Sequence, residues 1–176
     1  VVSREGLRMD PRKIEVVRNF EPTQINTVTK VRSFLGICSY YRRFIEGFSL
    51  VAAPLTDLTR DGVDVEVESQ TPKCQAAIQR LIQAITSEPV MCTPRFDRMF
   101  VVKTDAANQI GLGGVLSQAD DNGRERVVAY HGRRLTKHER NYTVTEIELL
   151  AAVDCIKHWR SYLWGRAFKL VVDHSA

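Results

Sequence analysis

The sequence predicts an α+β fold, in which a small helical region precedes a mixed α/β sheet with β-β-β-α-β order. Three observations support this prediction. Through residues 10–87, apolar residues recur at i, i+3, i+4 and i+7, as on the buried side of amphipathic helices. Beyond residue 89 the chain changes to short runs rich in β-branched and aromatic residues. One long helical segment then precedes a final β-run, so we place the domain boundary near residue 89.

The helical region is expected to follow a short hairpin in residues 1–9. Asp10 is the predicted N-cap of the first helix, which has Pro11 in its first turn and stops before Pro22. A second helix should start at Thr27 or Thr29 and end at Gly47. Its core-facing stripe is expected to contain Val31, Phe34, Leu35, Cys38 and Ile45.

Proline and glycine divide the rest of the helical region. A third helix over residues 50–58 contains Pro54 and is expected to be kinked or broken there. Residues 60–70 are polar and are predicted to form a loop. A fourth helix over residues 73–87 should end before Pro89.

The secondary structure of the second region is predicted from the spacing of its apolar residues and from its turn-forming residues. The sequence Asp-Asn-Gly at residues 121–123 is typical of a turn between two strands. A long helix is expected to end near Gly165, a typical C-cap residue. The predicted elements are strands 100–104, 112–117 and 126–132, helix 143–163 and strand 168–172.

Composition sets limits on the class of protein. The 176 residues are 44% apolar and 26% charged, as in an ordinary globular protein, and the net charge of +4 is a mild bias toward polyanionic partners. No run reaches the roughly 18 apolar residues of a membrane span, and no signal peptide is visible. The cysteines are scattered without metal-ligand spacing, which favours a reducing compartment and no zinc site: Cys38, Cys74, Cys92 and Cys155.

Three acidic residues have positions that predict a metal site. Asp105 ends the first strand of the second region, Glu148 lies early in the long helix, and Asp173 ends the strand after it. If strands 100–104 and 168–172 are neighbours, the three carboxylates converge at one end of the sheet. Converging carboxylates require a cation, and oxygen ligands suit two Mg²⁺ or Mn²⁺ ions that activate water for phosphodiester hydrolysis.

Each acid also has a structural interpretation. Asp105 suits a turn, Glu148 suits the helix dipole, and Asp173 suits a strand end. The adjacent His174 is a weaker candidate. A second set of residues, on the second helix, is expected to contact a nucleic-acid backbone, with Tyr40 as a further aromatic residue beside them: Lys30, Arg32, Tyr41, Arg42 and Arg43. A solvated helix face explains the same charges.

Several stretches resemble one known family. The run VRSFLGICSYYRRFIEGFSLVAAPLTDLT resembles the thumb of gypsy-type LTR retrotransposon reverse transcriptases, and VVSREGLRMDPRKIEVV resembles the end of the palm. The runs EPVMCTPRFDRMFVVKTDAANQIGLGGVLSQ, ERVVAYHGRRLTKHERNYTVTEIELLAAV and FKLVVDHSA resemble the start of the family's RNase H domain. The resemblance implies palm end in residues 1–9, thumb in 10–89, and an incomplete RNase H-like domain in 90–176.

The resemblance implies a function for these residues. Asp105, Glu148 and Asp173 match the family's first three RNase H acids, which implies hydrolysis of RNA in RNA/DNA hybrids with two Mg²⁺ or Mn²⁺ ions. The implied parent is a Pol polyprotein that performs RNA-directed DNA synthesis in a cytoplasmic virus-like particle, without contacting membranes. The thumb residues Arg42 and Arg43 would hold the template–primer duplex.

Departures and missing parts limit this expectation. Ala107, Gly132 and Gln70 replace the family's usual Ser, Ser and Trp. The polymerase acids and the fourth RNase H acid are expected outside this chain, so the isolated chain is expected to be a poor nuclease. The alternatives are a non-catalytic nucleic-acid-binding remnant and a decayed copy.

Overall fold

The structure is a computed structural model, which describes every residue except 1, 4–5, 88–90, 108–109 and 173–176. The chain divides into two compact units. One unit contains Arg8–Pro89, and the other contains Val2–Leu7 with Val90–Ala176. The N-terminal hairpin therefore groups with the sheet and not with the helices. No helix among the described residues has the length and apolar character needed to cross a membrane.

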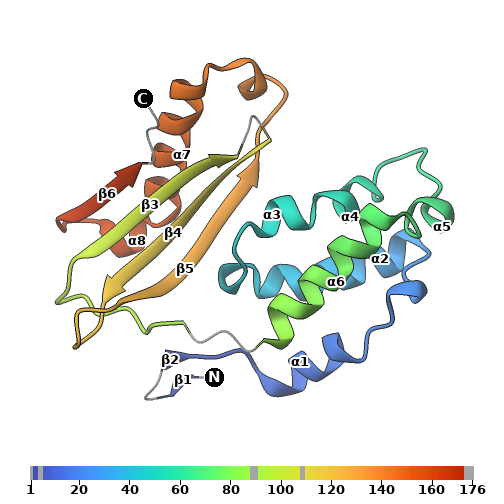
Figure 1. The fold of residues 1–176 in the computed structure, drawn as a ribbon, viewed down its shortest axis with the longest axis horizontal. Helices are drawn as coiled ribbons and strands as arrows, with labels where there is room; N and C mark the ends of the chain where they lie inside the picture. The colour runs from blue at the N-terminus through green and yellow to red at the C-terminus, as the bar shows by residue number, and fades with distance from the viewer. Residues whose placement is uncertain (1, 4–5, 88–90, 108–109, 173–176) are drawn as a thin grey trace. The chain divides into compact units, whose positions relative to one another are not determined.

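The first unit is helical, and its long helix α6 packs against α1, α3 and α4 (Figure 1). Its core is formed by fully buried side chains such as Val17, Phe34, Leu55 and Leu81. The helices and 3₁₀ turns are α1 (Pro11–Arg18), η1 (Pro22–Gln24), α2 (Val28–Tyr40), η2 (Arg42–Phe44), α3 (Phe48–Val51), α4 (Ala53–Asp57), α5 (Val65–Glu68) and α6 (Pro72–Thr86).

The predicted helix starts are confirmed by their caps. Asp10 accepts a hydrogen bond from the backbone N–H of Arg12 at 3.0 Å, and Thr27 accepts one from Lys30 N–H at 3.3 Å. The predicted break at Pro54 is also confirmed, because α3 and α4 are separate helices joined at Ala52. Proline is tolerated in the first turn of α4, where its missing N–H would have no intrahelical partner.

Two predictions in this unit were wrong. Helix α2 ends at Tyr40 and not at Gly47, and the chain tightens into a 3₁₀ turn. A turn with three residues per repeat brings Tyr41 and Phe44 to the same side, where both are buried. Residues 60–70 are not a pure loop, because Asp64 caps the short helix α5 by accepting from Val67 N–H.

The second unit contains a four-stranded sheet with the order β5-β4-β3-β6. Strand β3 pairs antiparallel with β4 and parallel with β6. These first and last strands are therefore neighbours, which meets the condition under which the acids were expected to converge. The hairpin β1–β2 pairs separately, and Leu7 also forms a bridge to Met91. The strands are β1 (Val2–Ser3), β2 (Gly6–Leu7), β3 (Phe100–Ala107), β4 (Gly111–Ala119), β5 (Glu125–Arg134) and β6 (Phe168–Val172).

Strand β3 is longer than predicted, which changes the setting of Asp105. The ladder with β4 continues beyond Thr104 through Asp105↔Gly113 to Ala107↔Gly111. The small residues that favoured a turn after residue 104 are instead compatible with pairing. Asp105 therefore lies inside the strand.

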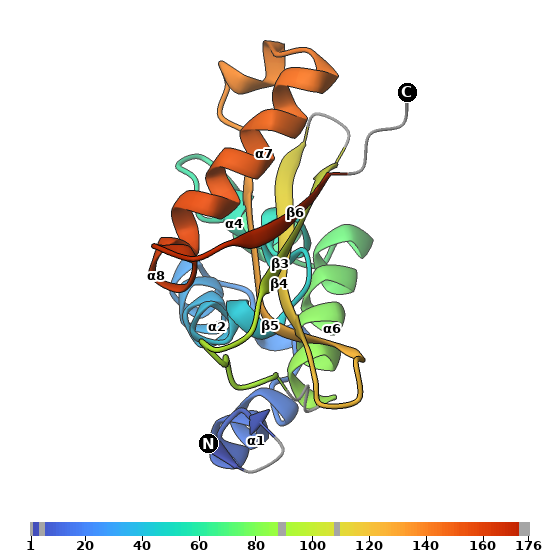
Figure 2. The ribbon, with the colours of Figure 1, turned by 90° about the vertical axis from the view of Figure 1, so that its left-hand side faces the viewer.

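A helix covers one face of the sheet, as Figure 2 shows. Helix α7 (Val144–His158) starts with a capping box formed by Thr143 and Glu146. The single helix predicted over residues 143–163 is in fact two, because the backbone at Trp159 leaves helical values (φ −93°, ψ 18°) before α8 (Arg160–Leu163). Trp159 is 1% exposed and belongs to the core cluster between helix and sheet.

Helix α7 packs closely against the sheet at Gly114 of β4. A Cβ atom at this position would lie 2.5 Å from Cys155 Sγ, 3.0 Å from the carbonyl oxygen of Lys103 and 3.3 Å from the Trp159 ring. Such distances are shorter than van der Waals contact, so only glycine fits without displacing the helix or the neighbouring strand. At the adjacent Gly113, the nearest atom would lie at an ordinary 3.8 Å.

The close approach predicts a large difference between two neighbouring substitutions. Gly114→Ala should lower the free energy of unfolding by about 1–3 kcal/mol, because the added methyl group overpacks the interface. Gly113→Ala is the matched control and should change it by less than about 1 kcal/mol. Urea unfolding of both variants, followed by circular dichroism, measures the difference. Equal stability of the two variants would contradict this description of the interface.

Candidate active site

Asp105 lies near the carboxyl end of β3, with its side chain exposed. Phe100 and Val102 of this strand belong to the core cluster under α7, and Thr104 is 5% exposed. Because side chains alternate along a strand, Asp105 lies on the opposite face. No side chain in the described part of the chain forms an ion pair with its carboxylate.

Glu148 lies in the second turn of α7 and is half-buried. It shares a helix side with Ala152 and Cys155, both of which are buried. The residues next to the two acids, Ile147 and Ala106, pack in the same apolar cluster. The structure therefore brings Asp105 and Glu148 to one end of the sheet, with Glu148 on the helix-covered side.

Asp173, like His174, lies outside the described residues. The residue that precedes Asp173 has a defined register in the sheet. Val172, the last residue of β6, pairs in parallel with Thr104, the residue before Asp105. The ends of β3 and β6 and the start of α7 meet at the same end of the sheet (Figure 1).

The donor chemistry of this end of the sheet suits a hard divalent cation. Carboxylate oxygens are the preferred ligands of Mg²⁺ and Mn²⁺, and the exposed Asp105 carboxylate has no described cationic side chain to neutralise it. Within the described ranges, no three His, Cys, Asp or Glu side chains lie close enough to hold a metal ion. Two of the three predicted ligands, Asp105 and Glu148, belong to those ranges.

A charged network attaches α7 and its preceding turn to β5. The guanidinium of Arg133 donates from Nη1 and Nη2 to the carboxylate of Glu139 at 2.8 and 2.9 Å. Its Nε donates to Asp154 of α7 at 2.8 Å, and the other oxygen of Asp154 lies 2.8 Å from His131 Nε2. The His131 ring stacks on His158 with centroids 3.7 Å apart. This network holds α7, and therefore Glu148, against the sheet.

The network lowers the pKa values of its two acids, Glu139 and Asp154. Hydrogen bonds from Arg133 and from the backbone N–H of Thr136 lower the pKa of Glu139 from 4.5 to about 2. Burial opposes ionisation of Asp154, but hydrogen bonds from Arg133 and His131 outweigh it and hold its pKa below 3.8. Hydrogen bonding to Glu139 in turn raises the pKa of Arg133. All three groups therefore remain charged at neutral pH.

The predicted nucleic-acid-binding residues of the helical unit differ in exposure. Lys30, Arg32 and Arg42 are exposed, and Arg43 is half-buried. Tyr41 is 2% exposed and packs edge-on against its neighbour, so its ring offers no stacking surface. Tyr40, the other aromatic residue expected at this surface, is 68% exposed, and Lys13 Nζ lies 4.1 Å above its ring.

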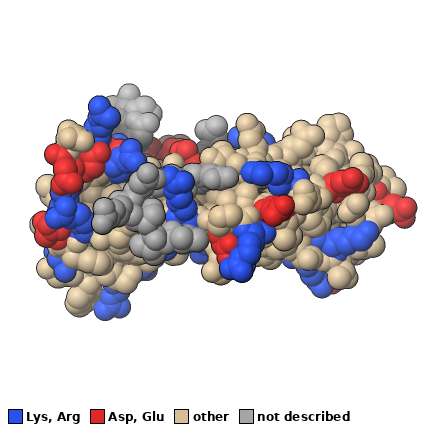
Figure 3. Space-filling model, turned by 90° about the horizontal axis from the view of Figure 1, so that it is seen from below, with Lys and Arg blue, Asp and Glu red and all other residues tan. Residues whose placement is uncertain are grey.

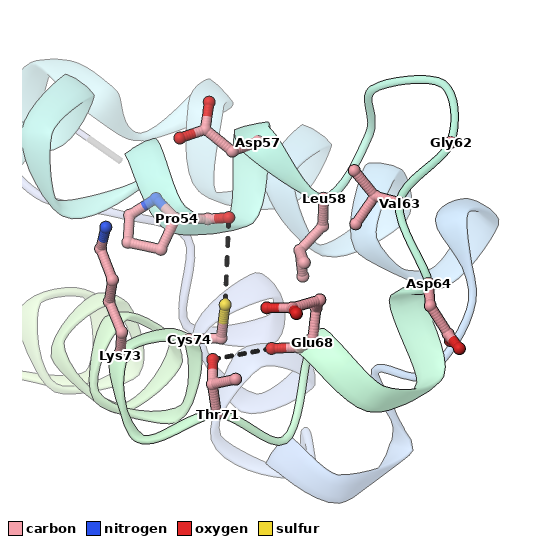
Figure 4. Close-up of a pocket in the computed structure, with 10 residues that line it drawn as sticks. All are labelled: Pro54, Asp57, Leu58, Gly62, Val63, Asp64, Glu68, Thr71, Lys73 and Cys74. Carbon is pink, nitrogen blue, oxygen red and sulfur yellow. Dashed lines mark hydrogen bonds between the residues drawn. The ribbon is translucent and has the colours of Figure 1, made fainter.

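The helical unit also contains a pocket of about 410 Å³ (Figure 4). It lies between α4, α5 and the start of α6, and Cys74 Sγ lies 3.9 Å from the carbonyl oxygen of Pro54. Asp57, Asp64 and Glu68 line it together with Lys73. None of the predicted site residues lines this pocket.

Residues 71–170 match the model of a family described as the RNase H-like domain found in reverse transcriptase. The chain belongs to this family. The match includes helix α6, which the sequence assigned to the thumb. The RNase H-like match also covers Asp105 and Glu148, while Asp173 lies just beyond it.

Curated relatives of this RNase H-like chain are Pol polyproteins. It is 37% identical to the retrovirus-related Pol polyprotein from transposon opus and 35% identical to that from transposon gypsy, both of Drosophila melanogaster. Each comparison covers 99% of this chain and 18% or 17% of the relative. A Tf2-3 polyprotein of Schizosaccharomyces pombe is 34% identical over 82% of the chain and 11% of the relative. The chain thus spans less than a fifth of these proteins.

Solved structures share the fold. A foamy viral protease-reverse transcriptase in complex with dsDNA matches with a TM-score of 0.79 and 18% identity, over 96% of this chain and 34% of that one. The protein in complex with an RNA/DNA hybrid matches with a TM-score of 0.76 and 19% identity, over 96% and 22%. The resemblance to gypsy-type Pol proteins and the mixed α/β fold expected from the sequence are confirmed.

Sequence reasoning missed the Arg133 network. Its members come from β5, from the turn before α7 and from α7 itself, so no local pattern joins them. The spacing of His131 and Arg133 along one strand was the available signal, because alternate strand residues share a face.

The lowered pKa of Glu139 predicts how stability depends on pH. A carboxylate with a depressed folded pKa stabilises the fold above its unfolded pKa, and this contribution is lost as pH falls from 4.5 through about 2. Arg133→Met should therefore reduce unfolding free energy at pH 7 by about 2 kcal/mol, with a deficit that shrinks as pH falls through this window.

Unfolding of the two proteins by urea between pH 7 and pH 2 measures this effect. The control is Arg140→Met, which removes an exposed arginine from the same turn and should leave the pH profile unchanged. A deficit that is constant across the whole range would disprove the role of the Arg133–Glu139 pair.

Proposed function

We propose that this chain contains the metal-binding centre of a ribonuclease that hydrolyses the RNA strand of RNA/DNA hybrids. Its ligands would be Asp105, Glu148 and Asp173. The observation that carries the proposal is the parallel pairing of β3 with β6, because it directs the ends of both strands to the start of α7. Family membership supports the same assignment.

Each proposed ligand would have a separate role in the reaction. Bound Mg²⁺ or Mn²⁺, two ions in the intact enzyme, would supply an activated water and stabilise the leaving oxygen. Asp105 would contribute an unneutralised carboxylate from the open face of the sheet. Glu148 would contribute one from the helix side, held in place by the Arg133–Asp154 contact. Asp173 would follow Val172 on the neighbouring strand.

We further propose that the helical unit contacts template–primer duplex and RNA/DNA hybrid through exposed cations. Lys30, Arg32 and Arg42 are exposed, with Arg43 partly so, and phosphate contacts require accessible charge. Structural neighbours solved in complex with dsDNA and with an RNA/DNA hybrid support this class of ligand. The rest of a Pol polyprotein would supply RNA-directed DNA synthesis, in a cytoplasmic particle.

A second candidate function is nucleic-acid binding without catalysis. It is favoured by the placement of Asp105 and Glu148 on different sides of β3, because carboxylates on opposite sides of a strand do not readily hold one metal ion. In that case the basic residues would bind nucleic acid, and the acids would no longer hold a metal ion. The two functions differ in their requirement for a divalent ion.

Metal binding provides the first test. Titration of the chain with Mn²⁺ should broaden the amide NMR signals at the end of β3 and the start of α7. Asp105→Asn should weaken this binding about tenfold or more, because it removes a charged ligand. Asp97→Asn, an exposed acid in the same unit, is the control and should bind Mn²⁺ like the wild type. Broadening that persists in Asp105→Asn would disprove the assignment.

Cleavage provides the second test. The 176-residue chain should cleave an RNA/DNA hybrid slowly, and the same segment within a complete polyprotein should cleave it rapidly with Mg²⁺. Asp105→Asn and Glu148→Gln should each reduce the rate about a hundredfold or more. Metal-independent binding of the hybrid without any cleavage, even in the complete polyprotein, would favour the non-catalytic function.

A further inference from the structure

The segment from the last turn of α7 through β6 has an unusual charge distribution. Between Asp154 and Asp173 there is no acidic residue, while five residues are basic and four are aromatic. The basic residues are exposed: Lys157, His158, Arg160, Arg166 and Lys169. Basic and aromatic residues interleaved in this way are the composition of surfaces that bind nucleic-acid strands.

Trp164 is the exposed aromatic residue of this segment. It follows the last residue of α8, and 72% of its surface is exposed, whereas Trp159 five positions earlier is 1% exposed and belongs to the core. The guanidinium carbon of Arg160 lies 4.3 Å from the centroid of the Trp164 ring. This cation–π contact places a positive charge beside an exposed aromatic ring.

A second arginine–aromatic pair lies nearby in sequence. Arg166 lies 5.0 Å from the centroid of Phe96 and donates a hydrogen bond to the carbonyl oxygen of that residue. Phe96 is 47% exposed and stacks on Tyr162 of α8. The two pairs therefore share α8 and the turn that follows it. We call Lys157, Arg160, Trp164 and Arg166 the α8 surface.

The charges of the α8 surface differ from those of Arg95 and Arg98 in the same unit. Arg95 and Arg98 form ion pairs with Asp97 and Asp121. Blue and red side chains are intermixed on the face of the molecule that Figure 3 shows. Across the described ranges, no acid forms an ion pair with Lys157, Arg160 or Arg166. Their charges are therefore available to a polyanion.

We propose that the α8 surface binds single-stranded nucleic acid, with one base stacked on Trp164 and phosphates contacting the basic side chains. A ring with one open face and an arginine beside it suits an unpaired base, whereas the bases of a duplex already stack on one another. Helix α8 follows the C-terminal end of α7, and Glu148 lies near the other end (Figure 2). The α8 surface is thus separate from the proposed metal ligands.

The inference rests on the proposed function only in that both ligands are nucleic acids. Binding of a labelled oligo-dT of about 12 nucleotides to the 176-residue chain is measured by fluorescence anisotropy in EDTA. Metal-dependent cleavage cannot occur in EDTA, so failure of this test leaves the cleavage result unaffected. Likewise, failure of the cleavage test leaves the result of this binding test unaffected.

Trp164→Ala should weaken oligomer binding about fivefold to a hundredfold, and Trp164→Phe should weaken it less, because a ring remains. Arg160→Gln should weaken binding and reduce the slope of log affinity against log salt by roughly 0.7. Binding should also quench the intrinsic fluorescence of the wild type, and this quenching should disappear in Trp164→Ala. Circular dichroism and urea unfolding verify that each variant is folded.

Lys137→Ala is the matched control, since Lys137 is an exposed lysine of the same unit outside the α8 surface. It should change the affinity by less than about twofold. The proposal would be overturned if Trp164→Ala and the wild type bind oligo-dT with equal affinity. It would also be overturned if oligo-dT binds without any change in intrinsic fluorescence. Equal losses in Lys137→Ala and Arg160→Gln would likewise show that general charge, and not this surface, binds the strand.

Discussion

The sheet unit depends on the close approach of α7 to β4 at Gly114. Helix and sheet can pack at this distance only where one partner has no side chain. The consequence extends beyond one contact, because the same helix carries Glu148 at one end and leads into α8 at the other. Any shift of the helix away from the sheet moves both candidate surfaces together. The position of a glycine thus controls the geometry of acids and cations that it does not touch.

Two further interactions restrict the start of α7. The capping box of Thr143 and Glu146 satisfies the first backbone N–H groups, and the Arg133 network joins the preceding turn and the middle of the helix to β5. A helix held at its start, in its middle and along its face has little freedom to rotate. Glu148 lies between these points of attachment, so its carboxylate is positioned before any ligand arrives.

Much of this fold was predictable from the sequence because its signals are local. Asp10 and Thr27 have side chains that cap the residues next to them, and Pro54 interrupts its own helix. The neighbouring of β3 and β6 also followed from element order, and with it the gathering of Asp105 and Glu148 at one end of the sheet. These predictions required only periodicity, capping and the direction of parallel strands.

The remainder depended on contacts between residues distant in sequence. The burial of Tyr41 depends on the 3₁₀ turn that also buries Phe44. The adjacent Arg42 and Arg43 suggested an exposed segment instead. The extension of β3 through Asp105 depends on pairing with β4, which turn-forming residues obscured. The exposure of Trp164 beside the burial of Trp159 depends on the break between α7 and α8. In each case tertiary packing outweighed local preference.

The parallel pairing of β3 with β6 has a consequence for the order of folding. Strands β3, β4 and β5 are consecutive and antiparallel, so they can form from short connections. Strand β6 reaches β3 only after β4, β5 and α7 have been made, and a long loop must close for the two strands to meet. Thr104 and Val172 therefore pair late, after synthesis has passed residue 172. The parallel pair at the end of β3 is thus among the last contacts of the sheet to form.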